Sequence, residues 1–371
     1  MRLLNTTDLT FQDFYETALE PYAALSHCWT TEPGQHEVTY QQLLADHQEL
    51  LAGYQFYKPS AEHNPEAPYG WRKIWDCCRL ARDRGLQWVW IDTCCIDKSS
   101  SAELSETINS MYRWYESATE CYVFLDDVHI TTRVDTVASQ ADTSPFSGDT
   151  EKFCASRWFT RGWTLQELLA PTGPVLFYDD VREYFGTLTA LAATISQATG
   201  IPLAYLTKRT AIGKACVAQR MCWASRRTTT RLEDMAYSLL GIFDINMPLL
   251  YGEGAKAFQR LQLAIIEQSN DETIFVWGLD PGGECPSTSD ESTATGKGML
   301  AASPASFINS GTVRPRPRPA WLLRSIERPP HHLTNRGISF HYVGGLTDFW
   351  NEGVETVMGL KSSTLGSKLA Y

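Results

Sequence analysis

The sequence has no stretch of about 18 consecutive apolar residues, which a helix needs to span a membrane. Its first residues, MRLLNTTDLTFQDF, also lack the uninterrupted apolar segment of a secretory signal peptide. We therefore expect a soluble protein of the cytoplasm, without a membrane span. In that reducing compartment the 10 cysteines are expected to be free thiols.

Positive charge is also scarce in this chain. Lys and Arg number 32 against 43 Asp and Glu, which gives a net charge of −11. One basic run, RPRPRP at residues 314–319, is short and stiffened by proline. Because an acidic surface repels phosphate backbones, this balance argues against nucleic acid as a partner.

The common signatures of enzyme chemistry are missing as well. The sequence contains no GxGxxG, Walker-type loop, HExxH or GxSxG, which argues against the usual dinucleotide, nucleotide, metal and serine sites. Cysteine spacing argues against zinc, because Cys77-Cys78 and Cys94-Cys95 are adjacent pairs. We expect no metal and no cofactor, and we interpret these cysteines as buried small hydrophobic residues.

Apolar and aromatic residues, by contrast, are plentiful. Aromatic residues make up 12% of the chain, so the interior is expected to rely on large rings. Runs at residues 22–26, 86–92 and 121–127 are nearly all apolar. Such runs are typical of strands that are buried on both faces of a parallel sheet.

Helical patterns alternate with these runs. One stripe of a 3.6-residue period is formed by Leu104, Ile108, Met111, Tyr112 and Tyr115. An earlier helix is predicted at residues 70–84, where Gly85 ends it. The alternation predicts an α/β fold with a doubly wound, mostly parallel sheet flanked by helices.

The second half of the chain is expected to be mainly helical after one more strand at residues 174–178. Apolar stripes predict helices from Leu188, from a capping box at residues 230–233, and over residues 255–269. Residues 273–277 (TIFVW) are predicted to form a further strand or an extended cover.

These patterns divide the chain into four parts. We predict a domain at residues 1–170, a helical extension packed on it at 171–278, a linker at 279–320 and a peripheral tail at 321–371. Residues 35–69 have weaker patterning and are interpreted as a variable insertion.

Polar residues follow three of the predicted strands. They are Ser26-His27-Cys28-Trp29, Asp92 and Asp126-Asp127. Ligands of doubly wound sheets bind outside the carboxyl ends of the strands, so these residues predict a small polar site. The alternative is that Asp92 only caps the next turn. His27 and Cys28 are adjacent and face opposite sides of a strand, so they cannot form a nucleophile–base pair together.

The segment SRWFTRGWTLQELLAP (residues 156–171) contains a further candidate, Glu167, in a predicted helix at residues 164–169. A carboxylate among apolar and aromatic groups is desolvated and can be held against a developing positive charge. The alternative is a capping box from Thr164 to Glu167, which matches the T-x-x-E pattern. Residue chemistry alone favours the capping box.

Three segments of the chain resemble the HET domain, the heterokaryon incompatibility domain of filamentous fungi. They are YAALSHCW (22–29), WVWIDTCCIDKSSSAELSETINSMYRWYESA (88–118) and SRWFTRGWTLQELLAP (156–171). Residues 227–277 resemble the extension that often follows this domain, and residues 300–307 and 333–340 resemble its later segments. The chain departs from the family at Thr30, where the family usually has glycine.

The resemblance implies a role in non-self recognition that ends in programmed cell death. HET domains are similar in fold to TIR domains, whose W-C-x-x-E-L helix carries a glutamate that serves NAD+ cleavage. Residues 163–168 have that shape, with Thr164 in place of Cys. The resemblance therefore implies that Glu167 is the catalytic residue and that the fold is TIR-like.

The resemblance also implies roles for the neighbouring residues. Ser26 and Trp29 would line the nucleotide pocket, with Trp29 as a stacking surface. Asp92 would order the site and Arg161 would pair with phosphate. NAD+ is then a substrate, and no cofactor is needed.

Two functions remain open at this point, besides an inert paralogue. The first is an enzyme, an NAD+ nucleosidase (glycohydrolase) that acts as a death effector. The second is a non-catalytic interaction module that signals death by assembly. Either function needs protein partners, namely an upstream incompatibility sensor or further copies of the chain.

Overall fold

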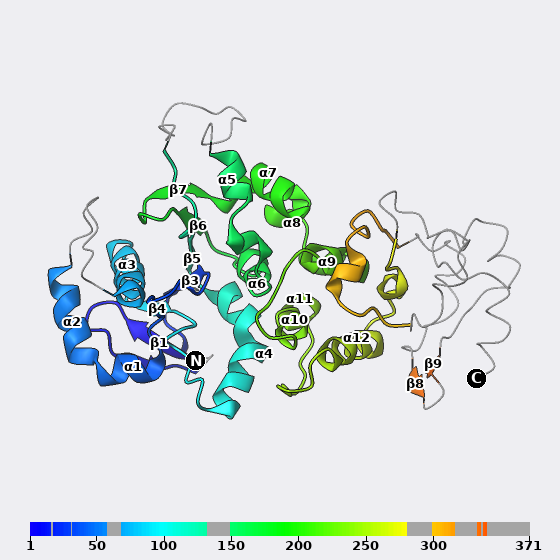
Figure 1. The fold of residues 1–371 in the computed structure, drawn as a ribbon, viewed down its shortest axis with the longest axis horizontal. Coiled ribbons are helices and arrows are strands. Elements are labelled where there is room, and N and C mark those ends of the chain that lie inside the picture. The colour runs from blue at the N-terminus through cyan, green and yellow to red at the C-terminus, as the bar shows by residue number, and fades with distance from the viewer. Residues whose placement is uncertain are drawn as a thin grey trace, which may run out of the picture. The chain divides into compact units, whose positions relative to one another are not determined.

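The computed structural model describes residues 1–15, 18–30, 32–57, 68–131, 149–279, 299–315, 332–334 and 337–339. The chain divides into two compact units, Met1–Thr210 and Ala211–Tyr371 (Figure 1). The expected linker at residues 279–320 is described only at residue 279 and residues 299–315, and most of the expected tail at residues 321–371 falls outside the described residues.

A seven-stranded sheet is the centre of the first unit, with the strand order β2-β1-β4-β3-β5-β6-β7. Its strands are β1 (Arg2–Asn5), β2 (Phe11–Asp13), β3 (Tyr22–His27), β4 (Trp88–Trp90), β5 (Glu120–Phe124), β6 (Val175–Tyr178) and β7 (Tyr184–Thr187). The four central strands β4, β3, β5 and β6 are parallel, whereas β1, β2 and β7 pair antiparallel at the edges. The α/β prediction is confirmed, but the sheet is mixed rather than mostly parallel.

The parallel centre of the sheet follows directly from the apolar runs. All six residues of β3 are buried, as are all three residues of β4. Trp90 of β4 packs edge-on against Trp114 and Tyr115, at centroid distances of 5.6 and 5.3 Å. Large rings therefore fill this part of the core, as the composition predicts.

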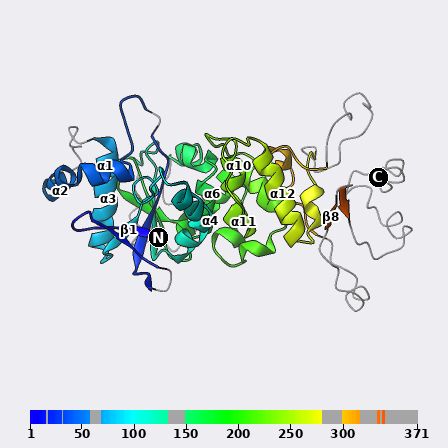
Figure 2. The same ribbon diagram turned by 90° about the horizontal axis from the view of Figure 1, so that it is seen from below.

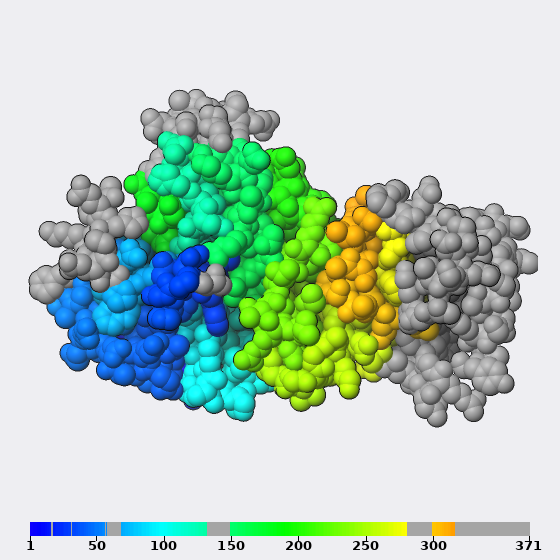
Figure 3. All heavy atoms as spheres, in the orientation of Figure 1, coloured from blue at the N-terminus to red at the C-terminus, as the bar shows by residue number. Residues whose placement is uncertain are grey.

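Helices cover both faces of this sheet. They are α1 (Tyr40–Ala45), α2 (His47–Phe56), α3 (Tyr69–Asp83), α4 (Ser101–Ser117), α5 (Thr150–Cys154), η2 (Arg157–Thr160), α6 (Thr164–Leu169), α7 (Leu188–Thr199) and α8 (Leu203–Leu206). Figures 1 and 2 show α3 on one face and α4 and α6 on the other. In Figure 3, blue, cyan and green segments lie side by side on the surface of this unit, because the sheet joins segments that are distant in sequence.

The backbone confirms the predicted helix end at Gly85 and shows a similar end at Gly200. Gly85 follows α3 with φ of +80°, and Gly200 caps α7 with φ of +70°. Both values lie in the left-handed region that glycine adopts without steric cost, so each glycine ends its helix.

The first unit extends beyond the expected boundary at residue 170. Strands β6 and β7 continue the sheet, and helices α7 and α8 follow them before Thr210. β6 lies next to β5 with Cys121 opposite Val175, so its apolar residues complete the core of the sheet.

The second unit contains mainly helices among its described residues. They are η3 (Ile212–Lys214), α9 (Val217–Ala224), α10 (Asp234–Tyr237), α11 (Leu240–Phe243), α12 (Lys256–Gln268), η4 (Glu272–Phe275) and η5 (Pro304–Phe307), with a hairpin of β8 (His332–Thr334) and β9 (Gly337–Ser339). The amide of Gln262 in α12 bonds both the carbonyl and the N–H of Ala301, at 2.9 Å each.

Two predictions for the second unit are wrong. Residues 273–277 do not form a strand, because η4 occupies most of this segment. The capping box at residues 230–233 is absent, since Glu233 is itself the N-cap of α10 without a side-chain capping bond. Its carboxylate instead accepts the N–H groups of Gly252 and Gly254, at 2.8 and 3.0 Å. A hydrogen bond from its own backbone N–H, together with these two bonds, lowers the pKa of Glu233.

Candidate functional site

The predicted residues Ser26 and Glu167 meet at the carboxyl end of β3. The Ser26 hydroxyl donates a hydrogen bond to Oε2 of Glu167 and accepts one from Nε1 of Trp158, at 2.8 Å. Ser26 and Trp158 are fully buried, and Glu167 is 5% exposed. The indole N–H thus orients the hydroxyl, and the hydroxyl orients the carboxylate.

Helix α6 places Glu167 in this position, and it does so without the capping box. Trp163 is the N-cap of α6 and makes no side-chain capping bond. The Thr164 hydroxyl donates to the carbonyl oxygens of Trp158 and Arg161, at 2.5 and 2.9 Å. Thr164 therefore fastens α6 to the preceding turn, and the capping-box interpretation of Glu167 is wrong.

A second pair of predicted residues, Trp29 and Asp92, is joined directly. Nε1 of Trp29 donates to Oδ2 of Asp92 at 2.9 Å, and Oδ1 of Asp92 lies 3.8 Å from Nε2 of His27. Burial raises the pKa of Asp92, and the positive charges of Lys98 and Arg161 only partly oppose that effect. Asp92 thereby orients the Trp29 ring, a role beyond the capping of the next turn.

His27 lies between this carboxylate and that of Glu37, whose Oε2 is 3.9 Å from Nε2. Burial lowers the pKa of His27 well below its ordinary value, and the charges of Lys73 and Arg161 lower it further. The imidazole is therefore neutral at pH 7. The thiol of neighbouring Cys28 has its pKa raised to about 12, chiefly by burial, so it does not act as a nucleophile at neutral pH.

Two cations lie over the Trp29 ring. The Lys98 ammonium is 3.8 Å from the ring centroid, and the Arg161 guanidinium carbon is 5.8 Å from it. Part of the indole face is thus already covered by Lys98, which the sequence did not identify. The positive charge of Arg161 and the negative charge of Glu167 both act on the Cys28 thiol.

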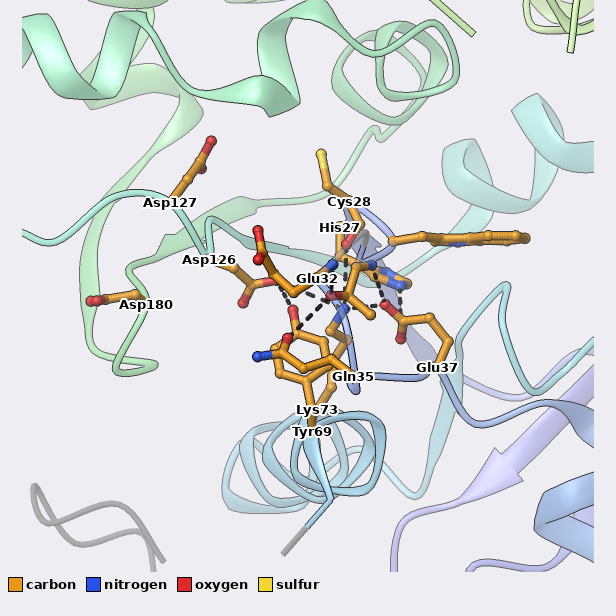
Figure 4. Close-up of polar contacts among 12 residues, drawn as sticks. His27, Cys28, Glu32, Gln35, Glu37, Tyr69, Lys73, Asp126, Asp127 and Asp180 are labelled. Carbon is orange, nitrogen blue, oxygen red and sulfur yellow. Dashed lines mark hydrogen bonds and ion pairs between the residues drawn. The ribbon is translucent and has the colours of Figure 1, made fainter. Parts of the chain in front are cut away.

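A network of charged residues supports the loop that follows β3 (Figure 4). Lys73 of α3 contacts Glu37 at 2.8 Å and Asp126 at 3.8 Å, and it donates to the carbonyl of Cys28 at 3.3 Å. Arg182 contacts the other oxygen of Asp126 at 2.5 Å. Burial alone would raise the pKa of Asp126, but Arg182 and Lys73 outweigh burial and lower it.

The departure at Thr30 has a structural role in the same loop. The Thr30 N–H donates to Glu37 at 2.8 Å, and its hydroxyl donates to Gln35 at 3.1 Å. The hydroxyl also accepts the N–H of Glu32 at 3.2 Å. Glycine at this position would remove both side-chain bonds.

The third predicted strand end has a different role. Asp127 accepts from the Ser156 hydroxyl at 2.8 Å and from the N–H of Arg157 at 2.7 Å. Asp127 therefore holds the start of the residue 156–171 segment against the end of β5, while Asp126 belongs to the charge network. Among the described residues, the side-chain partners of Asp126 are Tyr69, Lys73 and Arg182, and those of Asp127 are Ser156 and Arg157. Neither aspartate therefore bonds Ser26 or Glu167.

Metal-ligating side chains gather at one place in the described part of the chain. His129, Asp179 and Asp180 have ligand atoms within 4.8 Å of one another. His129 is already paired with Asp180 at 2.8 Å, which raises the pKa of the imidazole. The nine cysteines that the structure describes are free thiols.

No helix in the described ranges has the length and apolar character required to cross a membrane.

Comparison with known proteins agrees with the sequence resemblance. Residues 22–167 match the family described as heterokaryon incompatibility protein (HET). The vegetative incompatibility protein HET-E-1 of Podospora anserina is 41% identical over 267 residues, which cover 71% of this chain and 18% of that relative. The chain thus spans less than a fifth of the relative's length. No solved structure matches it. Through residues 22–167, the chain belongs to the heterokaryon incompatibility (HET) family.

Proposed function

We propose that this chain is an effector of heterokaryon incompatibility that promotes cell death by hydrolysing NAD+ between nicotinamide and ribose. One observation carries the proposal: a nearly buried carboxylate, Glu167, accepts a hydrogen bond from the Ser26 hydroxyl at the carboxyl end of a central parallel strand, and Trp158 in turn donates to that hydroxyl. The HET match includes these three residues. The name of the Podospora relative describes vegetative incompatibility.

The chemistry requires a fixed negative charge beside the ribose. The C–N bond to nicotinamide breaks, and its electron pair leaves with the nicotinamide nitrogen. Water then adds to the ribose carbon and releases a proton, which gives ADP-ribose and nicotinamide. Positive charge develops on the ribose in the transition state, and the Glu167 carboxylate stabilises it.

The neighbouring residues take supporting roles in this proposal. Ser26 is fully buried and bonds Glu167, so we assign it to positioning the carboxylate rather than to lining the pocket. Asp92 fixes the orientation of Trp29 at the edge of the site. Arg161 supplies positive charge for the phosphates of the substrate.

A purified protein and a cell assay test the proposal together. The 371-residue chain should consume NAD+ in vitro, and its expression should kill cells as NAD+ falls. Glu167→Gln keeps the size of the side chain and an acceptor for Ser26, so it should fold and lose at least about 100-fold in rate. The control is Glu151→Gln, at an exposed position on α5, which should leave the rate unchanged.

The alternative function, a non-catalytic module that acts by assembly, gives different results. Cell death with constant NAD+ would contradict hydrolysis and favour assembly with a sensor or with further copies of the chain. Loss of NAD+ that persists in Glu167→Gln would remove Glu167 from the mechanism while retaining the enzyme.

A further inference from the structure

Lys98 lies in the segment between β4 and α4, beside the candidate site. Its ammonium group is 3.8 Å from the centroid of the Trp29 ring and donates to the carbonyl of Thr93 at 3.4 Å. Arg161 approaches the same ring from the segment before α6, at 5.8 Å. Two cations from distant parts of the sequence therefore converge on one indole, whose orientation Asp92 fixes.

Lys98 differs from two of the other cations that act on His27. Lys73 and Arg182 are in ion pairs with Glu37 and Asp126, at 2.8 and 2.5 Å. Among the residues that the structure describes, no carboxylate oxygen lies within ion-pair distance of the Lys98 ammonium. The Lys98 side chain is exposed to solvent, and partial burial of its ammonium group lowers its pKa. An anion could therefore reach Lys98 from solvent and form a charge-assisted contact with it.

We propose that Lys98 and Arg161, next to the Trp29 ring, form the subsite for a diphosphate group of the ligand. Two cations match the two phosphates of such a group, and a guanidinium binds phosphate in a bidentate manner. Asp92 and Glu37 contribute negative charge to the same region. Because Glu37 is paired with Lys73, Lys98 and Arg161 together exceed the charge of Asp92, which leaves a net attraction for the anion.

The identity of the rest of the ligand depends on the proposed function. NAD+ carries a positive nicotinamide ring at one end and a negative diphosphate in its middle. The site has the opposite order of charges, with the Glu167 carboxylate at one end and the two cations beside Trp29 at the other. Lys98 thus deepens the assignment of NAD+ as substrate, although a diphosphate subsite can exist without hydrolysis.

Titration calorimetry of the 371-residue chain with inorganic pyrophosphate and with ADP-ribose tests this subsite. Lys98→Ala should weaken the binding of both by roughly tenfold or more, and Lys98→Arg should restore most of the loss. Adenosine, which has no phosphate, should show no such difference. The matched control is Lys152→Ala, an exposed lysine that pairs with Asp149 at 3.8 Å, and it should bind like the wild type.

Equal pyrophosphate affinity for wild type and Lys98→Ala, or no binding to a folded wild type, would overturn the subsite. Equal thermal unfolding of the variants and the wild type shows that folding is intact. The two proposals fail separately: NAD+ hydrolysis with a KM that Lys98→Ala leaves unchanged overturns the subsite alone. Lys98-dependent pyrophosphate binding without NAD+ hydrolysis overturns the proposed function alone.

Discussion

Replacing Ser26 with alanine removes one oxygen atom from a fully buried position and leaves the backbone and the volume of the core almost unchanged. That oxygen makes two bonds, one to the Glu167 carboxylate and one from the Trp158 indole at 2.8 Å. Leaving a buried indole N–H without its acceptor costs about 1–3 kcal/mol, and losing a hydrogen bond to a charged group costs about 1.5–3 kcal/mol. Because both bonds share one atom, we expect a total loss of about 2–4 kcal/mol.

Urea unfolding at pH 7 measures this loss, and steady-state kinetics measures its effect on the proposed reaction. We expect Ser26→Ala to lower kcat for NAD+ by roughly tenfold with KM little changed, because the carboxylate is less well oriented. The control is Ser99→Ala, an exposed serine that donates to Asp97 at 2.6 Å, where the loss should stay within about 0.5 kcal/mol. A Ser26→Ala protein as stable as the wild type would refute the buried bonds as described.

Three further predictions concern the charge network and the loop after β3. Asp126→Asn should lower the free energy of unfolding by about 3–5 kcal/mol at pH 7, because it breaks the contact with Arg182. The pKa of Asp126 in the folded protein is below 3.8, so the wild type should lose this advantage over the variant below about pH 4. Unfolding of both proteins over a series of acid pH values measures the difference. Because the pKa of His27 is lowered in the folded protein, only the unfolded chain takes up its proton below pH 6.5, and the free energy of unfolding falls by up to about 1.4 kcal/mol per pH unit. His27→Gln should make the free energy of unfolding less dependent on pH between pH 6.5 and 5. An unchanged slope would contradict the neutral imidazole. Thr30→Gly should lower the free energy of unfolding by about 0.5–1 kcal/mol and speed hydrogen exchange of the Glu32 backbone N–H, which loses its acceptor. An unaltered exchange rate at Glu32 would show that the Thr30 hydroxyl does not order the loop.

The elements that sequence patterns predicted are those whose signal is local. Strand β3 and helices α4 and α6 each carry their own periodicity or apolar run, and Gly85 and Gly200 mark helix ends by backbone conformation. The edge strands β1, β2 and β7 were not predicted, because three- and four-residue strands contain too few residues for a pattern to emerge. The mixed character of the sheet depends on these edges.

The site shows the same division between local and distant determinants. Polar residues at strand ends predicted Ser26 and Asp92 as candidates, because parallel strands bring their carboxyl ends to one edge. Lys98, Glu37 and Lys73 were not identified. Their roles depend on contacts with Trp29 and the loop after β3, and no spacing along the sequence encodes such contacts.

Two of the T-x-x-E patterns in this chain, at residues 164–167 and 230–233, show why a local motif was insufficient for Glu167. Both patterns match a capping box, and in both the glutamate bonds a distant group: Glu233 accepts the N–H groups of Gly252 and Gly254, and Glu167 accepts the hydroxyl of Ser26. A capping carboxylate adds about 1 kcal/mol to one helix end, whereas a carboxylate in a tertiary contact fixes two segments relative to each other. For Glu233 the result is an ordered turn around backbone amides. For Glu167 the partner is a single buried hydroxyl on a central strand, which holds a negative charge at the edge of the sheet where ligands of this fold class bind.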